Sequence, residues 1–510
     1  MQRILFTILI AWISLIPSCR DWEEHYHEAL KNLPDYNLFE YIETSSNLGI
    51  FSEMLKATGY DTIISASQTY TVWAPDNQAL EGIDRNDTEL ITEIIKNHIA
   101  RGNFSTSGIL SKPVKMLNGK NVNFERETSG FTFGNVTIVE PNIPASNGQI
   151  HLMNGYVPYR NNILEFINRT ESLDSLAKYL NSQNEWIFDP VNSIEIGFDP
   201  EGQVIYDSVF IFSNFVLNQL GSLGSEDSIY TAILPDNSAW IEAYERALSY
   251  FNIPEVYGGA VRMHMATRWA IVKDMVFREL VYDPGTFQYL VSTSQNVFYS
   301  PLDLFADAQQ YEMSNGIGYV TNQMPFADTA SWFKTIVVEA ESDFDRENTN
   351  SNIYVRTGLG TGLDISGDNY IVVDPTGISN IAQPSVRFSI PNTLSSVYDM
   401  YCVFVPASIV DPANTRPNRA TFQLTYVTTT LGRTRRVTLT PENNVTNPAG
   451  LTIMHLGQID FEFANVIDRD YDEIAVKLQV TNDVKIEEEN AGDFSRTMRI
   501  DCIIFKPVSE

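Results

Sequence analysis

Basic residues are scarce in this chain. Its 510 residues include 34 lysines and arginines against 64 aspartates and glutamates, which gives a formal net charge of −30 at pH 7. Proteins that bind nucleic acid neutralise its phosphates with lysine and arginine, so this balance argues against nucleic acid as a partner. The same balance disfavours polyanionic glycans and favours a well-solvated surface that repels its neighbours.

Histidine and cysteine are also few, and the motifs of common enzymes are missing. The 6 histidines are scattered, and the sequence has no C-x-x-C or His/Cys spacing suited to a metal. It has no G-x-S-x-G motif, no Walker loop and no G-x-G-x-x-G that opens a helix. The sequence therefore predicts a protein that is not an enzyme and has no catalytic residues.

Long apolar runs are missing except near residue 1. The run 4–16 is almost entirely apolar, Arg3 precedes it, and Ser18 and Cys19 follow it. A run of about 13 residues is too short for a bilayer core of ~30 Å, which needs ~20 residues. Its flanks are those of a secretory signal, so residues 1–18 are expected to be a signal peptide.

Cys19 resembles the lipidated cysteine of a bacterial lipobox. The acidic residues that follow it, at the start of an expected tether over 19–33, resemble the export signal of surface lipoproteins of the Bacteroidetes type. The resemblance implies a lipid anchor at Cys19 in the outer membrane, with the protein facing the cell exterior. An ordinary signal peptide with an incidental cysteine is the alternative.

The two other cysteines lie in the last third of the chain. Cys402 and Cys502 each sit inside an apolar, strand-like run. In an exported protein they could form one disulfide bridge, and two buried thiols in a β core are the other interpretation. The sequence does not choose between them.

An internal repeat organises the middle of the chain. The segment Tyr70–Leu80 (YTVWAPDNQAL) matches Tyr230–Trp240 (YTAILPDNSAW) at six of eleven positions, with an offset of 160 residues. Such a spacing indicates duplicated domains rather than solenoid repeats of roughly 20 to 50 residues. Each copy predicts a β-strand that ends at proline, followed by a helix capped by Asp76 or its counterpart. Further along, Asn147-Gly148 predicts a tight turn before a strand.

The first copy resembles the fasciclin-type adhesion domain. It carries the Tyr-Thr-x-x-Ala-Pro-x-Asn strand, an Asn-His pair at 97–98, and Asn-Gly-x-Ile-His at 147–151. The resemblance covers residues 34–167, and a degenerate second copy covers 168–335. It implies compact α+β modules for adhesion, in which His98 and His151 are hydrogen-bonded core residues. Lys96 and Asn97 are expected to face outward from their helix.

The last third of the chain has the sequence pattern of a β domain. Alternating strand-like runs broken by glycine, asparagine and proline recur over residues 336–510, as in a sandwich or jelly roll. Its two ends, VVEAE and MRIDCIIF, resemble those of jelly-roll carbohydrate-binding modules. That resemblance implies a structural calcium ion held by Glu339, Glu341 and Asp501, whose oxygens suit this ion. The alternative is that these charges alternate outward on an edge strand.

Sugar capture would need exposed aromatic side chains. The candidates in or beside the β domain are Trp332, Tyr354, Tyr370 and Tyr401. The chain has 24 tyrosines and 28 phenylalanines, so most aromatic residues must belong to cores.

The expected fold is therefore multidomain, with two α+β fasciclin-like domains followed by an all-β sandwich. Two functions fit this order. The first is a glycan-binding accessory lipoprotein that works with an outer-membrane transporter of the starch-utilisation type and its partner lipoprotein, with neutral polysaccharide as ligand. The second is an adhesive or structural lipoprotein that makes protein or matrix contacts without binding sugar.

Overall fold

The computed structural model describes residues 34–198, 203–348, 350–376, 383–466 and 474–508. The expected signal peptide, Cys19 and the expected tether lie outside the described residues. Within the described ranges, no helix is long and apolar enough to cross a membrane. The chain divides into two compact units, one with Met1–Glu165, Gly224–Ile229 and Glu312–Asn315, the other with Phe166–Leu223, Tyr230–Tyr311 and Gly316–Glu510.

The first unit is built on a seven-stranded sheet with the order β2-β1-β7-β6-β5-β4-β3. Its strands are β1 (Tyr70–Pro75), β2 (Ile99–Arg101), β3 (Ser111–Lys115), β4 (Asn121–Glu127), β5 (Gly130–Phe133), β6 (Val136–Ala145) and β7 (Gly148–Met153). Its helices are α3 (Leu38–Thr44), α4 (Gly49–Thr58), α5 (Tyr60–Ser65), α6 (Asn77–Leu80) and α7 (Thr88–Lys96). The predicted strand β1 and the helix after it are thus confirmed.

Strand β1 is buried on both faces. Val72 and Ala74 join a core with the helices, whereas Trp73 stacks on Phe133 of β5 with 4.2 Å between ring centroids. Asp76 caps α6 as predicted. Its side chain accepts a hydrogen bond from the Ala79 amide in the first turn of this helix. The sheet thus separates a helix-lined core from an all-β core.

The two histidines of the first copy lie in these cores, as predicted. His98 and His151 are 0% exposed. The ring of His98 donates to Ile94 O at 2.7 Å and accepts from the Val157 amide at 3.0 Å. Burial lowers the pKa of both rings to about 4, so both are neutral at pH 7.

One expectation about the neighbouring helix is wrong. Asn97 does not face outward: it is 2% exposed, and its side-chain amide donates to Val157 O at 3.2 Å. It is the C-cap of α7, where the chain turns inward toward β2. The helical period alone does not reveal that turn.

The second unit begins with a related arrangement. Strand β12 (Tyr230–Pro235) runs parallel to β17 (Gly316–Thr321) and antiparallel to β13 (Val276–Phe277), as β1 does to β7 and β2. β16 (Gln309–Met313) completes this sheet, and β14 (Leu290–Val291) pairs with β15 (Val297–Phe298). Its helices are α8 (Ile163–Arg169), α9 (Asp174–Ser182), α10 (Phe215–Leu220), α11 (Asn237–Leu248), α12 (Gly259–Val272), α13 (Pro301–Phe305) and α14 (Asp328–Ser331). The duplicated strand motif therefore forms the same local sheet twice.

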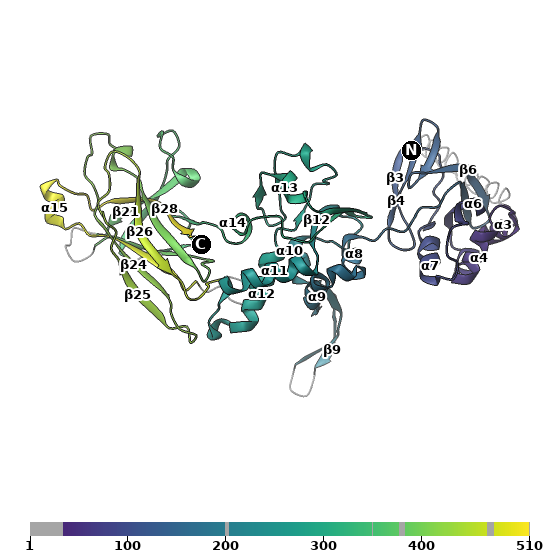
Figure 1. The fold of residues 1–510 in the computed structure, drawn as a ribbon, viewed down its shortest axis with the longest axis horizontal. Coiled ribbons are helices and arrows are strands. Elements are labelled where there is room, and N and C mark those ends of the chain that lie inside the picture. Colours follow the sequence, from purple (N-terminus) through teal and green to yellow (C-terminus); the bar gives the residue numbers. More distant parts are fainter. Residues whose placement is uncertain (1–33, 199–202, 349, 377–382, 467–473, 509–510) are drawn as a thin grey trace, which may run out of the picture. The chain divides into compact units, whose positions relative to one another are not determined.

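An insertion distinguishes the second copy. In the first copy only Gly59 separates α4 from α5. Between α9 and α10 the second copy has two paired ribbons, which Figure 1 shows projecting from the helices. They are β8 (Asn184–Phe188) with β11 (Phe210–Asn214), and β9 (Ile194–Phe198) with β10 (Val204–Asp207).

The rest of the second unit consists of two antiparallel sheets around one core (Figure 1). The first holds β18 (Ile336–Glu339), β20 (Ser351–Thr357), β21 (Asn369–Pro375), β23 (Val397–Phe404), β26 (Thr452–Asp460) and β28 (Met498–Pro507). The second holds β19 (Arg346–Asn348), β22 (Ser385–Ser389), β24 (Ala420–Val427), β25 (Thr434–Leu439) and β27 (Lys477–Asn482); a short helix, α15 (Ile486–Ala491), follows. Phe404 and Phe422 meet across the core at 6.3 Å. The expected β domain is present, and its assignment as a jelly roll stays a prediction.

The core of the two sheets extends into the second repeat. Phe251, Ala270 and Phe333 belong to the same buried cluster as the inner faces of both sheets. This shared apolar core explains why the second repeat and the β domain form one compact unit.

Cys402 and Cys502 are free, buried thiols in this structure, which is the second of the two interpretations and not the bridge. Cys402 lies in the shared core opposite Ile503. Cys502 instead lies opposite Glu339 of β18, beside a group of carboxylates. Burial raises the pKa of both thiols.

Candidate functional site

Two of the three acidic residues expected to hold calcium, Glu339 and Asp501, come together where β18 meets β28. Glu339 pairs in register with Cys502, the residue after Asp501, and the Ala340 amide donates to Asp501 O at 2.9 Å. Glu341 follows two residues after Glu339, just beyond the end of β18. The antiparallel pairing of the two ends of the domain thus brings carboxylates together that lie about 160 residues apart in the sequence.

A loop between β20 and β21 closes this acidic cluster. The Ser366 hydroxyl donates to Glu339 Oε1 at 2.6 Å, and the Ser366 amide donates to Asp501 Oδ2 at 3.3 Å. Gly367 has φ of 58°, and a β-carbon there would lie 3.0 Å from Glu341 Oε1. Nothing in the sequence pattern pointed to this loop, because its contacts depend on the pairing of distant strands.

Asp501 is buried, Glu339 and Glu341 are half-buried, and the three carboxylates have too few hydrogen-bond donors. Asp501 is 2% exposed, and Glu339 Oε2, Glu341 Oε2 and Asp501 Oδ1 are buried oxygens without a hydrogen-bond partner. Burial, and then the charges of Glu339, Glu341 and Asp364, raise the pKa of Asp501 to about 7. The alternative that these charges alternate outward is wrong for Asp501, whereas Glu339 and Glu341 do alternate with the buried Val338 and Ala340.

Ligand atoms of Glu339, Asp501 and Cys502 all lie within 4.8 Å of one another, a group that does not include Glu341. The oxygens of Glu339 and Asp501 are ligands of the kind that Ca²⁺ takes, whereas the Cys502 sulfur is not.

Two of the four sugar-contact candidates are packed into cores. Tyr370 is 3% exposed and belongs to a small apolar cluster with Ile365 and Val372. The Trp332 ring packs on Tyr250 and Phe251 at 5.4 and 5.6 Å. The prediction that Tyr370 binds sugar is therefore wrong, and the partly buried Trp332 packs against the core that the second repeat shares with the β domain.

The other two candidates are accessible but do not form one site. Tyr354 on β20 is exposed and has the Arg356 guanidinium 5.5 Å from its ring centroid. Tyr401 on β23 is half-buried and lies 5.0 Å from the ring of His455, which contacts Asp399 at 3.2 Å. Strands β21 and β28 lie between β20 and β23, which separates the two tyrosines by about 14 Å at ~4.8 Å per strand. The structure therefore leaves the aromatic candidates dispersed.

The outer face of the second sheet carries a continuous row of polar side chains. The row follows the cross-strand register and consists of Glu347, Arg387, Gln479, Gln423 and Thr438. Three of its members are joined by hydrogen bonds. Arg387 donates to Glu347 at 3.0 Å and to Gln479 at 3.1 Å. Lys477 from the next row reaches Glu347 at 2.5 Å.

This polar row was not recognised in the sequence, although its strands show the signal. In β24 and β27, buried apolar residues alternate with half-exposed polar ones, which is the pattern of a sheet with one solvated face. Only the register between strands shows that the polar residues line up. Amides, a guanidinium and a carboxylate in one row can donate to and accept from neutral hydroxyl groups.

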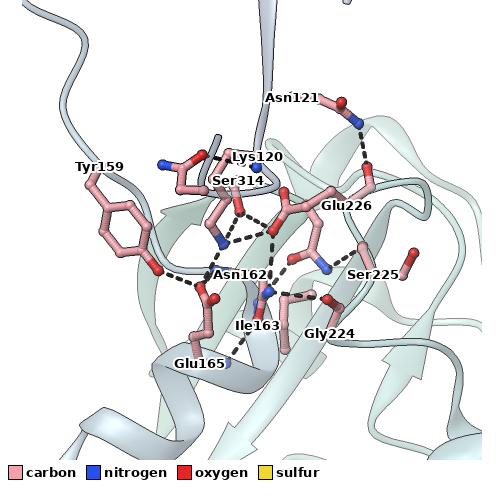
Figure 2. A network of polar contacts seen from close by, with 12 residues as sticks. Lys120, Asn121, Tyr159, Asn162, Ile163, Glu165, Gly224, Ser225, Glu226 and Ser314 are labelled. Atoms are coloured by element: carbon pink, nitrogen blue, oxygen red, sulfur yellow. Dashed lines mark hydrogen bonds and ion pairs between the residues drawn. The ribbon is translucent and has the colours of Figure 1, made fainter. Parts of the chain in front are cut away.

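The first unit contains a second polar site, around Lys120 (Figure 2). The Lys120 side chain is 4% exposed, and its ammonium lies 2.5 Å from Glu165 Oε2 and 2.7 Å from Glu226 Oε1. Ser314 also contacts it at 3.2 Å, and the Tyr159 ring lies 5.2 Å away. No sequence motif marks Lys120, which follows a glycine in a turn.

The Lys120 network is satisfied mainly by the protein itself. Burial favours the neutral form of Glu165, but hydrogen bonds from Lys120, Asn162 and Tyr159 outweigh it and lower the pKa of Glu165. Asn162 and Glu165 also cap each other's backbone at the start of α8. A cavity of about 620 Å³ lies beside the network, lined by asparagines such as Asn121 and Asn135. The arrangement is that of a structural ion-pair network.

Comparison with known proteins identifies a fasciclin domain in the first repeat. A family model described as the Fasciclin domain matches residues 46–157, which lie within the expected range 34–167. No curated protein matches the chain. The second repeat keeps its fasciclin assignment as a prediction.

Solved structures similar to this chain include both fasciclin and carbohydrate-binding domains. A FAS1 domain pair from the insect cell adhesion molecule fasciclin I has 14% identity and a TM-score of 0.22, covering 56% of this chain and 98% of that one. A xylan-binding domain of the CBM22 type has 13% identity and a TM-score of 0.22, covering 34% of this chain and 94% of that one. The CBM22-1–GH10 part of a Clostridium thermocellum xylanase has 11% identity and a TM-score of 0.22, covering 35% of this chain and 28% of that one.

Proposed function

We propose that this chain is a non-catalytic, lipid-anchored protein of the outer cell surface that captures neutral polysaccharide. In this proposal it serves a polysaccharide-uptake system, next to an outer-membrane transporter and its partner lipoprotein. The observation that carries the proposal is the polar row on the second sheet of the β domain. Cys19 would hold the chain to the outer membrane through lipid.

The chemistry of the polar row favours a neutral, hydroxyl-rich ligand. Arg387 is already paired with Glu347 and Gln479, so it offers hydrogen-bond donors without an excess of positive charge. The chain's net charge of −30 would repel a polyanionic glycan. Side chains that are fixed by one another lose little conformational entropy when they bind a sugar.

We further propose that Glu339, Glu341 and Asp501 bind a structural Ca²⁺. The ion would supply positive charge to the three orphaned oxygens and would tie the first and last strands of the β domain to the loop at Ser366. It would have no role in catalysis. Binding to the folded state alone would stabilise the domain by mass action.

A second function is supported by the fasciclin domain itself. Fasciclin-like domains imply adhesion, so the chain would hold other surface proteins or matrix without binding sugar. The two functions differ in one observable, which is the affinity for polysaccharide.

Affinity electrophoresis of the purified chain in gels that contain neutral polysaccharides tests the proposal. We expect slower migration in at least one gel from a panel of fructans, glucans, mannans and host glycans, with no release of reducing sugar. Unchanged migration across the whole panel would reject sugar capture and leave adhesion. Mass analysis of the membrane-extracted protein separately tests acylation at Cys19, and an unmodified cysteine would reject the lipid anchor.

A further inference from the structure

The ribbon β8–β11 of the second repeat carries apolar side chains that no other part of the described chain covers. Trp186 is 69% exposed, and Phe210 and Phe212 are 53% and 54% exposed. The insertion that contains the ribbon is replaced by a single glycine in the first repeat, so the fasciclin-like arrangement does not require it. Its apolar surface therefore needs a separate explanation.

The aromatic side chains of the ribbon form one face. Trp186 lies directly opposite Phe212, and Phe188 lies directly opposite Phe210. The two pairs are edge-to-face, with ring centroids 5.6 and 5.9 Å apart. Tyr206 of the adjoining ribbon extends this face by contacting Phe188 at 5.2 Å.

The other face of the ribbon is apolar as well. Ile187 and Ile211 lie opposite each other and are 43% and 49% exposed. A strand that is apolar on both faces is typical of a sheet that is buried on both sides. Isolated two-stranded ribbons are only marginally stable in water, so this composition indicates a surface that becomes buried against a partner.

The ribbon is held in a defined conformation where its two parts join. Asp189 accepts hydrogen bonds from the amides of Val191 and Asn192 at 3.0 and 3.3 Å. Ser193 accepts from the Val209 amide at 2.9 Å, and the Asp189 amide donates to Val209 O at 2.8 Å. The surface is thus preformed, which reduces the entropy lost on binding.

The negative charge of the insertion favours some classes of binding partner over others. No lysine or arginine occurs anywhere from Tyr179 to Glu245, whereas Glu185, Asp189, Glu195 and Asp207 all lie in the described parts of the two ribbons. These carboxylates would repel anionic lipid and the same ribbon of a second copy. Among the described residues, the aromatic face also lacks the row of polar partners that a sugar would need. Charge complementarity therefore favours a protein surface with lysine or arginine around an apolar centre.

We propose that the ribbon β8–β11 is a docking surface for a partner protein that presents an apolar strand or groove flanked by basic side chains. Trp186, Phe210 and Phe212 enter the apolar part, and the acidic side chains pair with the basic rim. With ~150–250 Å² per buried aromatic residue, the exposed parts of these three rings offer on the order of 300 Å², the size of functional patches on monomers. Among the described residues, β8 and β11 form a two-stranded sheet, to which a partner strand could be added. This inference is independent of sugar binding.

Selection of random peptides displayed on phage against the full chain tests the proposal. The variant W186S/F212S serves for counter-selection, and Y299S, which alters an aromatic residue that is 78% exposed outside the ribbon, is the matched control. Synthetic versions of the enriched peptides are then measured by fluorescence anisotropy at low and moderate salt. We expect enriched peptides with apolar residues next to lysine or arginine, at least tenfold weaker binding to W186S/F212S, and unchanged binding to Y299S. Higher salt and D207K should both weaken binding.

Three results would overturn the proposal. The first is a selection without ribbon-dependent peptides, or one whose peptides lack basic residues. The second is a dimer in light scattering that W186S/F212S dissociates, because the partner would then be a second copy. The third is sedimentation with phosphatidylcholine vesicles that the same variant abolishes, because the surface would then bind lipid. A variant in which one glycine replaces residues 184–213 gives the same comparison if the point substitutions affect solubility.

Discussion

Gly148 lies so close to Tyr70 that a β-carbon at residue 148 would be 1.9 Å from the Tyr70 carbonyl oxygen. Gly316 has the same relation to Tyr230 in the second repeat. In both copies the preceding asparagine also bonds to the start of a helix: Asn147 accepts from the Leu38 amide and Asn315 from the Ile163 amide, each at 2.9 Å. The Asn-Gly pair is therefore more than a turn signal, because it joins the central parallel strands to the first helix.

Gly148→Ala should strongly destabilise the first unit. The added methyl group meets backbone that cannot move without breaking the β1–β7 pairing, so we expect a loss of about 3–5 kcal/mol in the free energy of unfolding, as for other severe steric changes. Gly130→Ala is the matched control, because Gly130 has a similar φ of 147° and a β-carbon there would meet no atom within 4 Å. Only backbone strain remains there, about 1 kcal/mol or somewhat more. Urea unfolding of the two variants measures the difference, and equal losses would contradict the steric explanation.

The stability of the first unit should fall as the pH is lowered from 6.5 toward 4. The pKa of His98 and of His151 is about 4 in the folded chain and 6.5 when unfolded, so the unfolded chain binds more protons in this window. Each histidine contributes stability that is present above pH 6.5 and is lost as the pH falls, about 2 kcal/mol between pH 6.5 and 5. Hydrogen exchange of peptides from β1 and β7 at these two pH values measures the effect. The corresponding strands of the second repeat, where Met275 and Tyr319 replace the histidines, are the internal control, and an equal loss of protection there would contradict the explanation.

The β domain should gain thermal stability from calcium, and more at high pH than at low pH. The pKa of Asp501 is raised to about 7, so without a cation its protonated form stabilises the fold at low pH, and this contribution is lost as the pH rises through 7. Thermal unfolding of EDTA-treated protein at pH 5.5 and pH 8, with and without Ca²⁺, measures this. We expect a rise of several degrees with Ca²⁺ at pH 8.

Asp501→Asn should abolish most of the calcium response and stabilise the calcium-free protein, because it removes the buried member of three neighbouring like charges. Asp460→Asn, at an exposed position of β26, is the matched control and should respond like the original chain. A calcium response that persists in Asp501→Asn, or that is missing from the original chain, would reject the proposed ion site.

Lys120→Met should destabilise the first unit by about 3–5 kcal/mol. The substitution leaves Glu165 and Glu226 without their shared counter-charge in a buried network, and breaking such a network on one side is costly. Lys115→Met, at an exposed position of β3, should change stability by no more than about 0.5 kcal/mol. Hydrogen exchange should locate the loss at residues 224–229 and 312–315 as well as in the sheet. A loss confined to β3 and β4 would show that Lys120 does not hold those segments.

The sequence revealed local features well and long-range ones poorly. The repeat, the capped strand β1 and the two core histidines could be predicted, because each depends on a short motif. The resemblance of the two ends of the β domain predicted that Glu339 and Asp501 lie close together, and calcium binding there stays a prediction. Lys120 and the polar row were missed, because only the pairing of distant segments assembles them.

Aromatic residues were the least predictable candidates. The Tyr370 and Tyr354 side chains lie in similar alternating runs, yet the first is buried under a loop and the second is exposed. No motif in the sequence marks the aromatic ribbon of the second repeat as exposed. Only the fold shows that it has no covering layer among the described residues.

We propose that the polar row of the β domain binds neutral polysaccharide. The most direct measurement is affinity electrophoresis of the double variant R387A/Q479A beside the original chain and R356A, which alters an arginine on the other sheet. We expect at least a tenfold loss of affinity in R387A/Q479A, with an unchanged melting temperature, and full affinity in R356A. Equal retardation of all three proteins by the polysaccharide would contradict this proposal.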